Sequence, residues 1–190
     1  MIAVTIGFAI AFPLALLAHR YGRLEQPIGA FSALLYTIPS IALFELLVPF
    51  TGLSRTTVEI ALVAYTLVIL FPNILAGLNS APDDVLEAAR GMGMTRRQTL
   101  LQVELPLAVP AIVGGLRIAV VSTVAIATIA AFLLPQGLGY PIFLALKEPT
   151  PFKTEIYTAG GLAVALALTC DLLFVGLRRG LVPWASKGVA

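Results

Sequence analysis

Charge is scarce in this sequence. Only 12% of the 190 residues are Asp, Glu, Lys or Arg, whereas 59% are hydrophobic and the mean hydropathy is +0.98. A water-soluble domain of this length cannot hide so much apolar surface in one core, so lipid is the expected solvent. The net charge of +2 excludes a protein that binds nucleic acid mainly by neutralising phosphates.

Cysteine and histidine each occur once. Cys170 lies inside an apolar run, which excludes a disulfide framework or a thiolate metal cluster. His19 lies beside basic residues, and we interpret it as a solvated or headgroup residue. No G-x-x-x-x-G-K-[ST], H-E-x-x-H or G-x-S-x-G motif is present. We therefore expect neither a Walker-type ATP site nor a catalytic or metal centre, and the chain is not predicted to be an enzyme or to hold a cofactor.

Five apolar runs predict an all-α, polytopic membrane bundle that occupies residues 1–190 as a single domain. The runs are Ile2–Ala18, Pro27–Phe50, Thr57–Leu78, Val109–Leu134 and Glu155–Leu177. Positive charge follows the first run instead of preceding it, which argues against a signal peptide. Pro72 predicts a kink in the third run. Turn residues are frequent from Pro135 to Lys153, where we expect a short interfacial or re-entrant helix.

Basic residues are concentrated on one side of this predicted bundle. That side holds Arg20, Arg23, Arg90, Arg96, Arg97, Arg178, Arg179 and Lys187, and the other side holds Arg55, Lys147 and Lys153. Loops rich in Lys and Arg stay in the cytoplasm during insertion. The distribution therefore predicts an N-terminus outside the cell and a C-terminus in the cytoplasm.

One long polar passage, residues 80–107, interrupts the apolar runs. Ser80–Asp83 and Thr95–Gln98 have the spacing of capping boxes and predict the starts of two short helices. Gly93 predicts a sharp turn between them, because glycine accepts the left-handed conformation found at helix ends. Pro106 predicts, together with the proline four residues later, a bend into the next span.

A resemblance to a known family rests on this passage. Glu87, Ala88, Ala89, Gly93, Val103 and Leu105-Pro106 stand at the spacing of the EAA loop of ABC-importer permeases. The family usually has isoleucine where Val103 stands. In that family the loop is cytoplasmic, and its short helix docks in a cleft on the ATP-hydrolysing subunit. The resemblance implies that Glu87, Ala88, Ala89 and Gly93 couple this chain to a separate ATPase.

Two further stretches are similar to the glycine betaine/carnitine/choline branch of these permeases. They are TIPSIALFELLVPFTGL at Thr37–Leu53 and VILFPNILAGLNSAPDDVLEAARGMGMT at 68–95, and the external PQGLGYPIF follows the same pattern. The resemblance implies the transmembrane subunit of a type I ABC importer for a small osmoprotectant, in a bacterial or archaeal inner membrane. An amino acid such as methionine is the alternative solute, and a non-transporting scaffold is the alternative role.

The resemblance also implies the partners. These are an ATPase pair that binds ATP and Mg²⁺, an extracytoplasmic solute-binding protein, and a second permease subunit that is identical or related. A quaternary ammonium solute is recognised by cation–π attraction in an aromatic cage. We expect that cage on the binding protein, because the spans of this chain contain no concentrated aromatic set.

Several polar residues inside the predicted spans are candidates for the translocation path or its gate. Glu45 is costly at this depth, and it is interpreted either as a gate or contact for a cationic solute or as a structural or protonated acid. Thr37, Pro39 and Ser40 form either a hinge or a passive kink. Asn73 either lines a path or bonds a neighbouring helix.

Two further charged residues receive simpler interpretations. Arg117, in the fourth run, is expected to extend its long side chain to the cytoplasmic surface. Asp171, in the fifth run, is expected to lie near the membrane interface.

Overall fold

The computed structural model describes residues 1–148 and 153–181, and every regular element in these ranges is a helix. The elements are α1 (Ile2–Arg20), η1 (Gly22–Leu24), α2 (Glu25–Thr37), α3 (Ser40–Thr51), α4 (Arg55–Leu78), α5 (Asp83–Gly91), α6 (Arg96–Thr99), the π-helix η2 (Leu100–Glu104), α7 (Leu105–Ile129), η3 (Ala130–Phe132), α8 (Gly139–Lys147) and α9 (Lys153–Leu181). A helix satisfies its own backbone hydrogen bonds, which lipid cannot do for it.

Four helical segments in the described ranges are long and apolar enough to cross a membrane. They are α1, α4, the segment Arg96–Phe132 and the part of α9 up to Arg178. The pair formed by α2 and α3 brings the number to five if it is counted as one span. The predicted all-α bundle of about five spans is therefore confirmed.

The second span, predicted over Pro27–Phe50 with a hinge or a passive kink at Thr37, Pro39 and Ser40, is broken at these residues. α2 ends at Thr37, α3 begins at Ser40, and the chain bends by 99° between them. Pro39 explains the break, because a proline ring disfavours the helical conformation at the residue before it. Ile38 is accordingly extended, with a ψ of 122°.

Hydrogen bonds from two hydroxyl groups hold this bend. The Thr37 hydroxyl donates to the Leu34 carbonyl at 2.7 Å, within the last turn of α2. The Tyr65 hydroxyl, which comes from α4, donates to the carbonyl of Ile38. Carbonyls that the break frees thus have donors, as apolar surroundings require.

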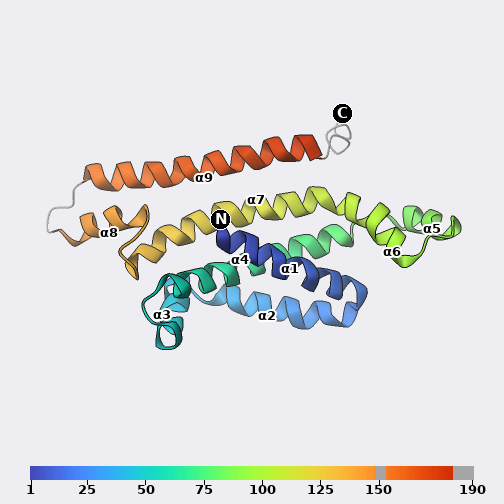
Figure 1. The fold of residues 1–190 in the computed structure, drawn as a ribbon, viewed down its shortest axis with the longest axis horizontal. Helices are drawn as coiled ribbons and strands as arrows, with labels where there is room; N and C mark the ends of the chain where they lie inside the picture. The colour runs from blue at the N-terminus through green and yellow to red at the C-terminus, as the bar shows by residue number, and fades with distance from the viewer. Residues whose placement is uncertain (149–152, 182–190) are drawn as a thin grey trace.

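α1, α4 and α7 form the packed centre of the bundle (Figure 1). The buried residues that join them are Ala11, Ala15, Ala18, Leu70, Phe71, Ile74, Leu75, Leu78, Ala108, Ile112 and Ala119. α1 contributes only alanines to this cluster, at a spacing that puts them on one helix face. Lipid is as apolar as these side chains, so close van der Waals packing of small residues favours the contact between the helices.

The crossing of α4 and α7 requires a glycine. A Cβ atom added at Gly115 would lie 2.7 Å from the Cβ of Asn73. The Asn73 amide donates to the Ile69 carbonyl at 2.7 Å within its own helix. α4 continues as a helix through the neighbouring Pro72. Asn73 therefore lies at a tight helix crossing.

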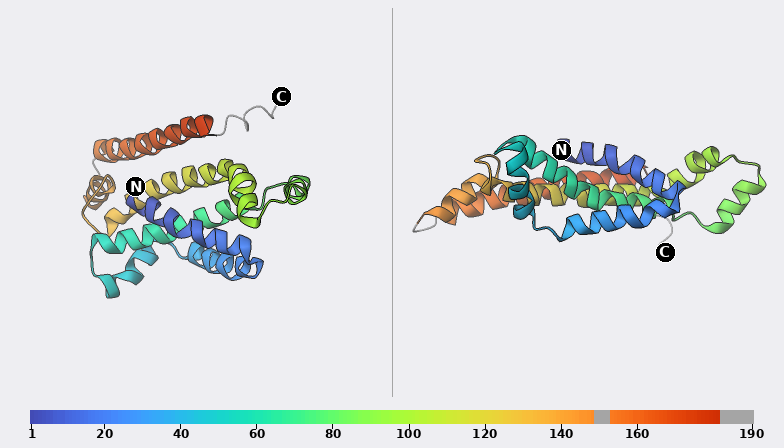
Figure 2. Two further views of the ribbon diagram at one scale, coloured as in Figure 1. Left: turned by 45° about the vertical axis from the view of Figure 1, so that its right-hand side comes forward. Right: turned by 90° about the horizontal axis from the view of Figure 1, so that it is seen from below.

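α9 lies along the outside of the bundle against α7 and α8 (Figures 1 and 2). Only 6% of its most apolar stretch is buried, compared with 50% for α4. α8 is the short helix expected between Pro135 and Lys153, so that prediction is confirmed. α9 must meet lipid or other subunits over most of its surface.

The segment from Arg96 to Phe132 is one continuous stretch of 37 helical residues that consists of α6, η2, α7 and η3. It remains helical through Pro106 and Pro110, and its ribbon changes direction between α6 and α7 (Figure 2), in keeping with the predicted bend. The wider π-turn of η2 directly before them relieves the clash between a proline ring and the carbonyl four residues earlier. The segment is about 55 Å long at the helical rise per residue.

The end of α1, the segment α5–α6 and the end of α9 lie at the same end of the bundle (Figure 1), and most of the described basic residues belong to these elements or to η1. The described members of this group are Arg20, Arg23, Arg90, Arg96, Arg97 and Arg178. The starts of α4 and α9, together with α8, lie at the other end. The predicted division into two sides is thus confirmed, while Lys187 and the side chain of Arg179 lie outside the described residues. That the arginine-rich end is cytoplasmic stays a prediction.

Candidate coupling and translocation sites

α5 and α6 project beyond the end of the bundle, where a separate protein can reach them (Figures 1 and 2). Glu87 and Ala88 are exposed on α5, whereas Ala89 is 1% exposed where α5 packs on α6 and η2. Gly93 is exposed and has a φ of +76°, the left-handed conformation that its position was predicted to need. Of the two alanines predicted to approach an ATPase, only Ala88 faces outward.

The local sequence explains where these two short helices begin. The Thr95 hydroxyl accepts from the Gln98 backbone N–H at 3.4 Å, and the Gln98 side chain accepts from the Thr95 N–H at 2.8 Å. This capping box is confirmed. The one predicted at Ser80 is wrong, because Pro82 occupies the N-cap of α5. The Ser80 hydroxyl instead donates to the Gly77 carbonyl at 2.7 Å, at the end of α4.

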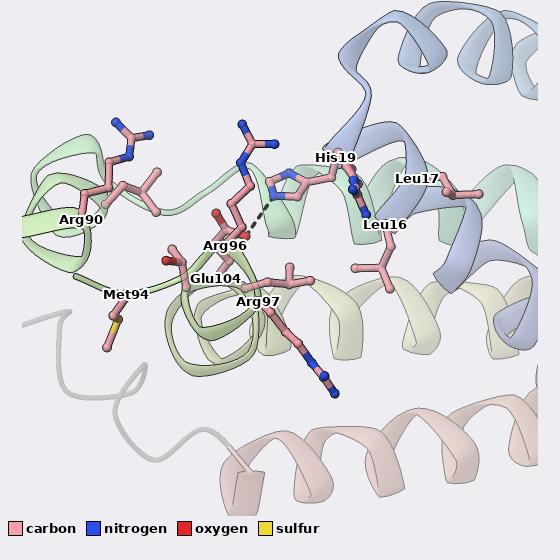
Figure 3. Close-up of a pocket in the computed structure, with 12 residues that line it drawn as sticks. Leu16, Leu17, His19, Arg90, Met94, Arg96, Arg97 and Glu104 are labelled. Atoms are coloured by element: carbon pink, nitrogen blue, oxygen red, sulfur yellow. Dashed lines mark hydrogen bonds and ion pairs between the residues drawn. The ribbon is translucent and has the colours of Figure 1, made fainter. Parts of the chain in front are cut away.

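A pocket of about 740 Å³ separates the end of α1 from α5, α6 and η2. Arg20, Arg90, Arg96 and Arg97 line it, and Glu104 is the only acid among its lining residues. Figure 3 shows the side chains of Arg96 and Arg97 extending to opposite sides of α6. The excess of positive charge attracts anionic groups to this end of the protein.

His19 joins three helical segments beside this pocket (Figure 3). Its Nδ1 atom lies 2.6 Å from Oδ1 of Asn79, at the end of α4, and its Nε2 atom lies 3.0 Å from Oε2 of Glu104, in η2. The His19 side chain is 22% exposed and that of Glu104 is 15% exposed. This corrects the interpretation of His19 as a solvated residue, because it connects α1 to the end of α4 and to η2.

The five predicted path residues lie at three different places. Thr37, Pro39 and Ser40 form the break between α2 and α3. Asn73 is half-buried at the crossing of α4 and α7. Glu45 is exposed on α3 and forms no hydrogen bond or ion pair within residues 1–148 and 153–181. A role for these residues in translocation stays a prediction.

Arg117 and Asp171 form an ion pair between α7 and α9. The guanidinium donates to both carboxylate oxygens, with Nη2 of Arg117 2.7 Å from Oδ2 of Asp171. Arg117 lies twelve residues from each end of α7, about 18 Å at the helical rise. The pairing corrects the expectation that Arg117 extends to the cytoplasmic surface, because its guanidinium binds a carboxylate of α9. That Asp171 lies near the membrane interface stays a prediction.

The two side-chain pairings differ in how far the sequence indicated them. Arg117 and Asp171 carry opposite charges inside predicted spans, and ionisable residues in membranes usually pair with one another. Their opposite charges were therefore a sequence signal that Arg117 and Asp171 could pair. The partners of His19 lie 60 and 85 residues away in ordinary polar positions, and no local pattern indicates them.

The family of this chain is settled by comparison with known sequences. A family model described as "Binding-protein-dependent transport system inner membrane component" matches residues 3–183. The chain belongs to this family. It is a multi-pass inner-membrane component of ABC importers, a permease subunit rather than a catalytic one.

Permeases of known type resemble this chain over nearly its whole length. The glycine betaine/carnitine/choline transport system permease protein OpuCD of Bacillus subtilis (strain 168) is 36% identical over 185 residues, 97% of this chain and 80% of the relative. The osmoprotectant import permease protein OsmW of Salmonella typhimurium is 36% identical over 197 residues, 100% of this chain and 89% of the relative. The carnitine transport permease protein OpuCB of Listeria monocytogenes is 31% identical over 97% of this chain and 84% of the relative.

Solved structures support the fold. An inward-facing structure of the MetNI methionine ABC transporter superimposes with a TM-score of 0.83, covering 95% of this chain and 89% of the matched chain, at 22% sequence identity. This permease subunit therefore has the fold of an ABC-importer permease, as the sequence predicted.

Proposed function

We propose that this permease subunit forms the translocation path of an ATP-driven importer for a small quaternary ammonium osmoprotectant, such as glycine betaine, choline or carnitine. The observation that carries the proposal is the similarity to permeases of these names over 97% to 100% of the chain. An amino acid such as methionine is the alternative solute, but the likeness to the methionine transporter is one of fold, at 22% identity. A scaffold without transport needs no projecting coupling helix.

α5 is the element proposed to dock on an ATPase partner that binds ATP and Mg²⁺. It exposes Glu87 and Ala88 beyond the bundle, and Gly93 turns the chain directly from it into α6. α6 continues into η2 and α7 without a break. A displacement of α5 by the ATPase is therefore passed to a membrane-spanning helix by a stiff helical segment, as rigid-body switching requires.

Two further partners complete the proposed importer. Most of the α9 surface is exposed, as are large apolar side chains of α2 and α3 such as Phe31, Tyr36 and Phe50. Surfaces of this kind suit a second permease subunit and lipid. An extracytoplasmic binding protein is proposed to select the solute and deliver it to the end of the bundle where α8 lies.

The solute class is tested by uptake. Cells that express this chain with its ATPase and binding protein are given labelled glycine betaine, choline and carnitine, with unlabelled amino acids as competitors. We expect ATP-dependent uptake that only quaternary ammonium analogues suppress. Suppression of uptake by an amino acid would show that the importer carries amino acids instead. If the assembled complex takes up none of these solutes, the chain is better explained as a scaffold that does not transport.

The coupling role of the segment is tested with two neighbouring glycines. Gly93→Val puts a β-branched residue at a φ of +76°, whereas Gly91 has no positive φ and open space around it. We expect Gly93→Val, and separately Glu87→Lys, to lower uptake at least about tenfold while the permease still inserts, since strain of about 1–3 kcal/mol displaces α5. Gly91→Val is the matched control. Equal uptake in the two valine variants would contradict the assignment.

A further inference from the structure

The ion pair between Arg117 and Asp171 is partly exposed and joins two predicted membrane-spanning helices. The Arg117 side chain is 45% exposed and that of Asp171 is 20% exposed on the surface of this chain. Arg117 stands at the middle of α7. Charged side chains at this depth cost about 3 kcal/mol or more in lipid and usually face a water-filled cavity or the interior of an assembly. In the assembled importer this face is therefore expected to meet water or protein.

A groove of about 390 Å³ lies beside the ion pair. It is lined by Gly114, Arg117, Ile118, Val121, Ser122 and Asp171. The α7 residues recur at helical spacing, so they form one stripe along the helix. A Cβ atom added at Gly114 would meet nothing within 4 Å. The groove thus has one positive group, one negative group and the hydroxyl of Ser122 between otherwise apolar walls.

We propose that this groove is a transfer site for zwitterionic solutes, in which Arg117 binds the carboxylate and Asp171 faces the quaternary ammonium group. The inference rests on the function proposed above. Without solute, the two side chains neutralise each other. A zwitterion supplies an opposite charge to each of them, so that opening the pair leaves no charge unpaired in a low-dielectric site. The bidentate geometry of arginine suits a carboxylate.

Choline makes a sharp comparison because it carries the ammonium group without a carboxylate. If choline displaced Arg117 from Asp171, the guanidinium would be left without an anion, at a cost that glycine betaine avoids. The groove therefore favours zwitterions over a simple cation. Charge, rather than an aromatic surface, provides this discrimination.

The position of the pair also connects it to the energy source. Arg117 is on the continuous helix that begins at Arg96, 21 residues or about 32 Å away. Asp171 is on α9, which is a separate helix packed against α7. A movement of the coupling segment that shifts α7 relative to α9 changes the distance between the two charges. The site is thus placed to bind solute in one state of the cycle and release it in another.

The test compares two solutes in the same cells. Uptake of glycine betaine and of choline is measured for the complete importer with Arg117→Gln, and the ratio of the two rates is compared with that of the wild type. The binding protein is unchanged, so a changed ratio comes from the permease, and the ratio does not depend on the amount of assembled complex. We expect the ratio of glycine betaine to choline uptake to fall at least about tenfold, because the carboxylate of glycine betaine loses the guanidinium that binds it, whereas choline has no carboxylate that could lose it.

A second variant leaves the ion pair intact and fills the groove. A Cβ atom added at Gly114 or at Gly161 meets nothing within 4 Å, so this chain has room for leucine at both positions. Gly161 lies on α9 and does not line the groove, so Gly161→Leu is the matched control. We expect Gly114→Leu to assemble with its partners and to lower glycine betaine uptake relative to Gly161→Leu. This variant decides the question if Arg117→Gln shows no uptake of either solute, or if the wild type carries glycine betaine alone.

The outcomes separate this inference from the proposed function. An unchanged ratio in Arg117→Gln, or equal glycine betaine uptake in the two leucine variants, overturns the transfer site and leaves the importer intact. The pair then only holds α7 to α9. Uptake of choline alone by the wild type also overturns it, since no carboxylate needs Arg117. Uptake of none of these solutes by the assembled wild type overturns the proposed function and the inference with it.

Discussion

The most apolar stretches of α4 and α9 have almost the same mean hydropathy, 2.1 and 2.0, but the two helices have very different surroundings. Half of the apolar stretch of α4 is buried within the chain, compared with 6% for α9. α4 crosses α1 and α7 through small residues, whereas α9 reaches α7 through contacts that include the Arg117–Asp171 ion pair. Hydropathy thus predicts that a helix lies in the membrane, whereas the positions of small residues and of a few polar groups decide which helices it packs against.

The largest expected effect lies at the α4–α7 crossing. Gly115→Leu inserts a side chain where even a Cβ atom would be 2.7 Å from Asn73. We expect a loss of about 3 kcal/mol or more, because overpacked helices must separate. Thermal unfolding of the purified complex measures it. Gly114→Leu, which adds the same side chain one residue earlier, is expected to fold, and a similar loss in both variants would contradict a tight crossing.

A smaller loss is expected when a central leucine is shortened. Leu70 is 0% exposed between α1, α4 and α7. The Leu70 side chain is surrounded by apolar groups both in the folded protein and when its helix is separated in lipid. Leu70→Ala therefore lowers the stability mainly through the cavity that it leaves. At about 24 cal/mol per Å³, a cavity of roughly 100 Å³ costs about 2 kcal/mol. Unfolding of the variant in detergent would show an unchanged midpoint if the centre were loosely packed.

The third expected loss of stability concerns His19, which links α1 to the end of α4 and to η2. His19→Ala removes the contacts with Asn79 and Glu104. We expect a loss of about 1 kcal/mol, the usual net value of a hydrogen bond that is partly exposed to water. The double variant with Glu104→Ala should cost less than the two single losses added together, since both remove the same contact. Additive losses would show that the contact contributes nothing.

The smallest effect is expected on α9. Leu172 is 68% exposed, and Leu172→Ala leaves no cavity if lipid covers this face. We expect a change below about 0.5 kcal/mol in the stability of the isolated subunit, as for substitutions outside the packed centre. The same substitution measured in the assembled importer locates the second subunit. A loss comparable with that of Leu70→Ala in the assembly would show that protein, not lipid, covers Leu172.

Much of the fold and of the coupling segment could be predicted because the rules involved act over a few residues. The Thr95–Gln98 capping box and the left-handed Gly93 follow from local geometry, and both are confirmed. Local rules failed where a neighbouring proline changed their context. Pro82 occupies the N-cap of α5, so the helix does not begin at Ser80.

The candidate site depended more on tertiary structure. The sequence placed a break near Pro39, but the 99° bend is held by Tyr65 from another helix. It placed two alanines in the coupling helix, and packing against α6 and η2 turned Ala89 inward. A sequence pattern states which residues share a helix face, but the rotation of that face depends on every neighbour.

The sequence by itself determined that this chain is a multi-pass helical membrane protein with one long polar passage, residues 80–107, because hydropathy and local hydrogen bonding depend on short stretches of chain. Only the tertiary structure decided that Arg117 meets Asp171 and that His19 meets Glu104, 54 and 85 residues apart. Such pairs depend on how whole helices cross, and the crossings depend on the fit of small residues such as Gly115 against their neighbours.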